Sequence, residues 1–117
     1  MSHTAWLASR TPEAPVDLVA CVRALFKAHP EWNALHRADA FIAASEQLLR
    51  RVLSHDCPAR SSALDLLAAD ACVTYAFEAA ADEPGTIAAR AELAMRRIAA
   101  IAAEYEPASP NLIPGVR

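Results

Sequence analysis

The sequence predicts an all-α protein, an up-down four-helix bundle with an irregular N-terminal arm and a proline-rich C-terminal tail. Apolar residues recur at helical spacing in four segments, and none of the eight prolines falls inside one of them. Proline inside a helix costs about 3 kcal/mol, because it lacks a backbone N–H and clashes with the preceding turn. The chain has only two glycines, and its β-branched residues do not alternate as they do in strands.

Length and composition place broad limits on function. A chain of 117 residues is expected to form a single helical domain over 1–117. Its net charge of −3 gives no basic field that favours nucleic acid, and no apolar run reaches the roughly 20 residues that span a membrane. Three cysteines without CxxC spacing favour reduced thiols in a cytoplasm of bacterial type. We therefore expect a cytoplasmic protein with no nucleic-acid or membrane partner.

The chain begins with an arm and a short helix. Residues 1–13 show no periodicity and are expected to be irregular, although Trp6 and Leu7 are able to dock on the body. The first helix is expected over 15–28, where Pro15 suits the first turn. Its apolar stripe consists of Leu18, Val19, Val22, Leu25 and Phe26. This is the shortest of the four predicted helices.

The second helix is expected over 31–55 and is clearly amphipathic. Its apolar face consists of Leu35, Ala38, Phe41, Ile42, Leu48, Leu49, Val52 and Leu53. Its polar face consists of Trp32, His36, Asp39, Glu46, Arg50 and Ser54. Ser45 lies within the apolar face, where we expect its hydroxyl to bond back to the carbonyl of Phe41; a ligand contact is the alternative.

The third helix, expected over 60–81, carries two apolar stripes. One consists of Leu64, Leu67, Ala68, Ala71, Cys72 and Tyr75, and the other of Leu66, Ala69, Val73, Phe77 and Ala80. A helix that is apolar nearly all round is buried on two sides. Each helix of a four-helix monomer normally keeps one solvated face. The second stripe therefore needs a cover, which is the N-terminal arm, the C-terminal tail or another subunit.

The fourth helix is expected over 86–105, after a turn at Pro84 and Gly85. Its apolar residues are spaced at three and four positions, which is typical of a bundle seam: Ile87, Ala91, Ala94, Ile98, Ile101 and Tyr105. Glu92 and Arg96 form an expected i, i+4 pair on its outside. The tail, 106–117, contains three prolines and cannot continue the helix. Short connections favour antiparallel neighbours throughout.

Several polar residues are candidates for ligand binding. His29 and Trp32 lie near the end of the first helix, where His29 is expected to serve as the C-cap. Asp70 and Glu78 lie with Thr74 on one line along the third helix, and the simplest interpretation is that this line is its solvent-exposed face. His36 is expected to form a solvated pair beside Asp39. His55, Asp56 and Cys57 are consecutive, and adjacent residues on a loop usually point apart.

The motifs of common enzymes and metal sites are absent from the sequence. The chain has no Glu-x-x-His for a di-iron site, no Cys/His spacing for zinc and no nucleophile elbow. We therefore predict no metal, no cofactor and no catalytic residues. The basic residues cluster only at Arg50–Arg51, at Arg96–Arg97 and at Arg90, which is weak support for nucleic-acid binding.

The leading functional hypothesis is a non-enzymatic interaction module. A surplus apolar stripe on the third helix would be a binding surface if exposed. We expect Leu66, Val73 and Phe77 to form a homodimer interface there, or to bind another protein. The alternative is a small-ligand- or metal-binding bundle with its site at His29 and Trp32 or at Asp70 and Glu78.

Overall fold

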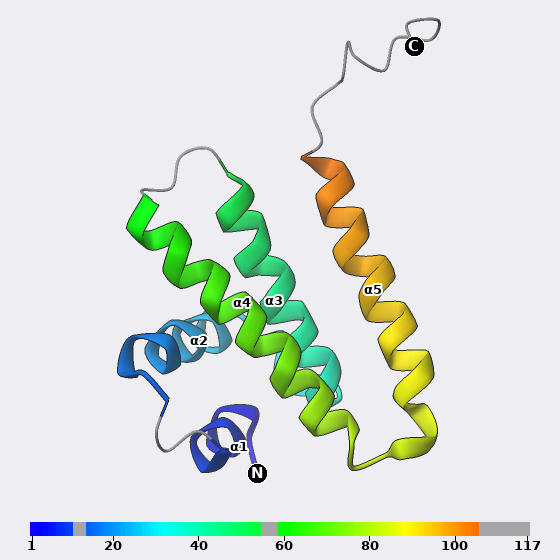
Figure 1. Cartoon of the computed structure of the whole chain (residues 1–117). Coiled ribbons are helices and arrows are strands. Elements are labelled where there is room, and N and C mark those ends of the chain that lie inside the picture. Colours follow the sequence, from blue (N-terminus) through cyan, green and yellow to red (C-terminus); the bar gives the residue numbers. More distant parts are fainter. Residues whose placement is uncertain (11–13, 55–58, 106–117) are drawn as a thin grey trace, which may run out of the picture.

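The computed structural model describes residues 1–10, 14–54 and 59–105 (Figure 1). Within these ranges it contains five α-helices, two short 3-10 helices and no strand. The elements in chain order are α1 (His3–Arg10), α2 (Val16–Ala28), η1 (Pro30–Ala34), α3 (Arg37–Leu53), α4 (Ala59–Ala80), η2 (Pro84–Thr86) and α5 (Ile87–Glu104). The prediction of an all-α protein is confirmed. The expected tail, 106–117, and His55, Asp56 and Cys57 lie outside the described residues.

The three longest helices alternate in direction. Figure 1 shows α3 and α4 lying antiparallel, with α5 turning back after the 81–86 connection to run in the same direction as α3. The shorter helices α1 and α2 cross this layer at the left of the view, and α2 contacts both α3 and α4. α3 and α4 make the most extensive helix contact in the described chain. α3 is therefore the element on which both the N-terminal helices and α5 converge.

The N-terminal arm is helical where we expected it to be irregular. Residues 3–10 form α1, and the Ser2 hydroxyl accepts a hydrogen bond from the backbone N–H of Ala5 at 3.0 Å. Trp6 and Leu7 are both buried, so the docking that the sequence allowed does occur. The prediction was wrong because so short a segment has little helical stability of its own. Its conformation depends on docking, which local periodicity does not report.

The predicted second helix, 31–55, is divided by an extended step. η1 ends at Ala34, and Leu35 and His36 have extended backbone with ψ of 154° and 145°. His36 then caps α3, because its Nδ1 accepts the backbone N–H of Ala38 at 3.1 Å. Its Nε2 donates to Glu83 at 2.5 Å, so the predicted pairing with Asp39 was wrong. The break also turns Trp32 inward, and Trp32 is buried rather than on the polar face.

α4 buries mainly small side chains. Its buried residues are Asp65, Ala68, Ala69, Cys72, Ala76, Ala79 and Ala80. Two of them belong to each predicted stripe, whereas Asp65, Ala76 and Ala79 belong to neither, so the buried face overlaps both stripes and coincides with neither. Small side chains allow helix axes to approach to about 8 Å. Because the close contact with α3 is made by these small residues, the larger Leu66, Leu67 and Phe77 of α4 remain exposed.

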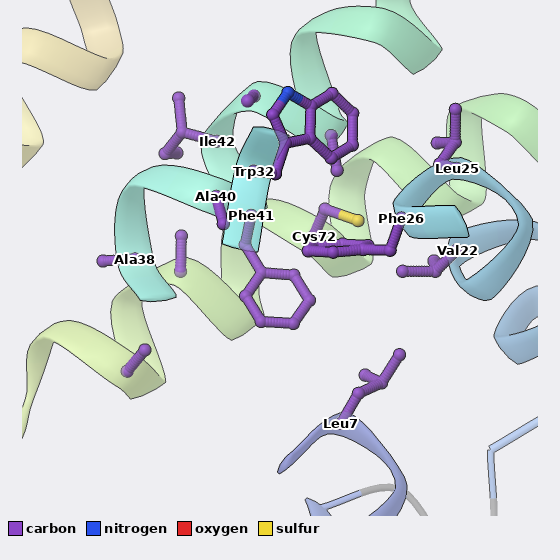
Figure 2. Close-up of a cluster of buried hydrophobic side chains, with 14 of the residues drawn as sticks. Leu7, Val22, Leu25, Phe26, Trp32, Ala38, Ala40, Phe41, Ile42 and Cys72 are labelled. Carbon is purple, nitrogen blue, oxygen red and sulfur yellow. The ribbon is translucent and has the colours of Figure 1, made fainter. Parts of the chain in front are cut away.

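Phe41 on α3 is the centre of the aromatic core (Figure 2). It is fully buried, and its ring centroid lies 5.1 Å from that of Phe26 on α2, 5.5 Å from Trp6 on α1 and 5.8 Å from Tyr75 on α4. Aromatic pairs at such distances add stability beyond the area they bury. One side chain therefore joins four helices.

Hydrogen bonds from His3 hold α1 against this core, and the protonation of His3 makes the docking of α1 sensitive to pH. Its Nε2 donates to the carbonyls of Trp32 and Leu35, each at 3.2 Å, while its buried Nδ1 has no hydrogen-bond partner. Burial lowers the pKa of His3 below 6.5, and the positive charges of Arg37 and His36 lower it further. A second proton would lie buried without an acceptor.

We expect the stability of the protein to fall on acidification through His3. Because the pKa of His3 is lower in the folded chain, the unfolded chain binds more protons, and the free energy of unfolding decreases as the pH falls through about 6.5. The decrease levels off below the folded-state pKa. Urea unfolding of the wild type and of His3→Gln, measured from about pH 7.5 to about pH 5, should show the steeper decrease in the wild type. Equal slopes would contradict this role of His3.

Candidate functional site

An apolar groove lies between α4 and α5 and has α3 at its base. It has a volume of about 190 Å³ and is lined by Ser45 and Leu49 from α3, by Leu66, Ala69, Asp70 and Val73 from α4, and by Ile98 from α5. A smaller hollow nearby is lined by Ile42, Ala76, Phe77, Ala80, Arg90 and Ala94. We refer to the two together as the α4–α5 groove. It is the part of the described surface where large apolar side chains line a concavity between long helices.

The structure brings the three predicted interface residues to this groove. Leu66 is 53% exposed, Phe77 is 43% exposed and Val73 is half-buried. α1 does not cover them, and α5 covers them only in part. Sequence reasoning missed the role of α5, because its apolar seam was assigned to the bundle as a whole. Only Ala94 and Ile101 of that seam are buried.

Ser45 does not make the hydrogen bond that we predicted. It is fully buried on α3, and its hydroxyl has no partner, so the expected bond to the carbonyl of Phe41 is absent. A buried hydroxyl without a partner costs about 1–3 kcal/mol. Since Ser45 also lines the groove, the groove contains a polar atom that still requires a hydrogen-bond partner.

α5 is joined to α3 by a series of ion pairs, which we call the α3–α5 ladder. Arg90 Nη1 lies 2.9 Å from Asp39 Oδ1, Arg97 pairs with Glu46, and Arg50 Nη2 lies 3.1 Å from Glu104 Oε2. The predicted polar face of α3 therefore contacts α5 through Asp39, Glu46 and Arg50. The sequence does contain a signal for these pairs. Asp39 and Glu46 are seven residues apart on α3, and the charged residues on α5 recur at the same spacing, at Arg90, Arg97 and Glu104.

Most of the arginines that cluster in the sequence pair with carboxylates in the structure. Arg90, Arg97 and Arg50 each meet a carboxylate, and Arg96 lies 3.8 Å from Glu92 in the predicted i, i+4 pair. These cations therefore do not form an unopposed basic patch of the kind that binds nucleic-acid phosphates.

His29 and Trp32 lie together at a separate, polar hollow. His29 is the C-cap of α2, as predicted, and its ring stacks on that of Trp32 with centroids 4.3 Å apart. Its Nδ1 lies 3.1 Å from Glu31 Oε2. The hollow measures about 340 Å³ and is lined by His29, Glu31, Trp32, Ala43, Glu46, Gln47, Arg50 and Arg97. Its charged groups pair with one another or with Glu104.

Asp70 and Glu78 lie on the exposed side of α4, away from His29 and Trp32. The Thr74 hydroxyl donates to the backbone carbonyl of Asp70 at 3.3 Å, which is a local helix contact. In the described ranges, no group of three or more His, Cys, Asp or Glu side chains is arranged to hold a metal ion. The four ligand candidates therefore lie in two separate places, His29 and Trp32 at the polar hollow and Asp70 and Glu78 on α4.

The described thiols are held in their neutral form. Burial raises the pKa of Cys72 to about 12. Burial, followed by the charge of Asp65, raises the pKa of Cys21. The Cys21 thiol lies 3.7 Å from Asp65 Oδ1, which also accepts from Arg51 at 3.2 Å. A nucleophilic cysteine needs a lowered pKa, so this cluster is structural.

Comparison with known protein families, with curated proteins and with solved structures finds no match to this chain. Among the described helices, none combines the length and the apolar character required to cross a membrane.

We expect the Cys21 thiol to become more reactive when Asp65 loses its charge. In Asp65→Asn the carboxylate no longer raises the pKa of Cys21, while Arg51 still lowers it. Alkylation by iodoacetamide at about pH 8 should therefore be faster at Cys21, as measured by peptide mass spectrometry. Cys72 is the internal control, because burial alone dominates its pKa. An unchanged rate at Cys21 in a folded variant would contradict the assigned role of Asp65.

Proposed function

We propose that this chain is a non-enzymatic interaction module that forms a homodimer through the α4–α5 groove. The observation that carries the proposal is the exposure of Leu66 and Phe77 beside a groove whose base holds the unpartnered Ser45 hydroxyl. Burying a Leu or Phe side chain contributes about 1.5–3 kcal/mol. Large apolar side chains around a concavity are typical of interaction sites.

A second copy is the occupant that the charges favour. The acidic side chain of Asp70 lines the groove, and Glu78 is exposed farther along α4. The outer side of α5 presents Arg96 and the 70% exposed Met95. If α4 of one copy packs on α5 of the other, apolar side chains meet apolar ones and Asp70 approaches Arg96 of the second copy. Such a contact is repeated by two-fold symmetry.

This dimer would also complete the bundle that the sequence predicts. α4 and α5 of one chain form an antiparallel pair (Figure 1). Two such pairs, related by a two-fold axis along the helices, make four helices in up-down order. In our proposal, the four helices of the up-down bundle are therefore α4 and α5 from each of the two chains.

The cysteines support a cytoplasmic location for this module. Cys21 and Cys72 are free thiols, and Cys72 is buried in the contact between helices. Unpaired cysteines are typical of proteins kept in a reducing compartment. The alternative function, a small-ligand- or metal-binding bundle, rests on the polar hollow at His29 and Trp32 and predicts a bound mass in the native protein.

We expect the wild type to have twice the 12.5 kDa mass of one chain in native mass spectrometry and in light scattering. Leu66→Asp and Phe77→Asp should each weaken the dimer roughly 100-fold, because each places a charge where an apolar side chain would be buried. Both variants should remain helical by circular dichroism.

Leu67→Asp is the matched control for this experiment. Leu67 follows Leu66 on α4 and is 52% exposed, but it does not line the groove. Its substitution should leave the dimer intact. A monomeric wild type would end the proposal, as would equal effects at positions 66 and 67. A non-covalently bound small molecule or metal in the native spectrum would favour the alternative.

A further inference from the structure

α5 supplies one wall of the groove but is poorly anchored by apolar contacts. Its buried residues are Ala94 and Ile101, while Leu93 and Met95 are exposed. An alanine and an isoleucine bury little surface for a helix of 18 residues. Ile87 and Ile98 are half-buried and add to this contact. Apolar contacts have no direction, so they do not fix how far α5 lies along α3; the α3–α5 ladder supplies contacts that do.

The ladder specifies one register between the two parallel helices. Asp39 and Glu46 on α3 meet Arg90 and Arg97 on α5, whereas the last pair, Arg50 with Glu104, has the opposite polarity. A slip of α5 by seven residues in one direction places Glu104 beside Glu46. A slip in the other direction places Arg97 beside Arg50. Like charges would meet in either case, so the reversal excludes both alternatives.

The central pair is the best shielded part of the ladder. The Glu46 side chain is 13% exposed and that of Arg97 is 35% exposed. Both line the polar hollow at His29, on the other side of α5 from the α4–α5 groove. They do not line the proposed interface.

We infer that Glu46 and Arg97 are positioning residues for self-association: their ion pair fixes the α5 wall and thereby the shape of the groove that receives the second copy. This inference rests on the proposed dimer. It predicts that a charge pair outside the contact surface controls the affinity of that surface. An interface built on α4 alone would not respond to this pair.

Reversal of the charges tests the inference. Arg97→Glu places two carboxylates together, and Glu46→Arg places a second guanidinium group beside that of Arg97. We expect each to weaken the dimer about tenfold, and the double variant E46R/R97E to restore the wild-type dissociation constant to within about threefold, as a coupled pair does in a double-mutant cycle. Sedimentation equilibrium gives the constants. Arg23→Glu on the exposed side of α2 controls for the change in net charge.

Hydrogen exchange of α5 separates the two possible failures. In Arg97→Glu the amides of α5 should exchange faster than in the wild type while those of α3 and α4 stay protected, and the double variant should reverse the change. A monomeric wild type overturns the dimer and the coupling together. Unchanged α5 exchange in Arg97→Glu overturns the positioning role whatever the oligomeric state, as does failure of the double variant to recover.

Discussion

The close contact between α3 and α4 through small side chains is the constraint on which the rest of the structure depends. Alanines, Cys72 and Asp65 occupy the buried positions of α4, so the two helices approach closely and little volume is available between them. The large side chains of α4 lie at the margin of this contact, as the half-buried Tyr75 does against Phe41. Leu66 and Phe77 must therefore project beside it, and whatever covers them has to come from outside the α3–α4 pair.

α3 contacts two groups of neighbouring helices by different physical means. On one side, Phe41 joins α1, α2 and α4 through ring contacts in a dry core. On the other side, Asp39, Glu46 and Arg50 hold α5 through partly exposed ion pairs. Such pairs contribute about 0.2–1 kcal/mol each, far less than buried rings. The N-terminal half of the molecule is thus stabilised by burial, while α5 is held both by a few apolar side chains, chiefly Ile101, and by these ion pairs.

Hydrophobic periodicity predicted the helices that local sequence specifies. It did not predict the features that depend on tertiary contacts. The apolar stripe and Pro15 located α2 almost to the residue, at Val16–Ala28. Nothing in the chain around Leu35 indicated the extended step there, because it depends on the contacts of Trp32 and on capping by His36. For α4, the two stripes were recognised, but hydrophobicity alone gave no reason to expect the alanines, rather than the larger apolar residues, to be buried. Only the distance between helices makes that choice.

The same reasoning explains why a groove exists between α4 and α5. An arginine–carboxylate pair spans two long side chains, so it holds two helix backbones farther apart than an alanine contact does. The Glu46–Arg97 pair therefore sets the distance between α5 and α3, while α4 lies at the shorter distance from α3 that alanines permit. The unequal spacing leaves the space at whose base the Ser45 hydroxyl has no partner. Shortening the ladder would narrow the groove, and lengthening it would move the α5 wall away, so the long charged residues on the facing sides of α3 and α5 set the width of the groove.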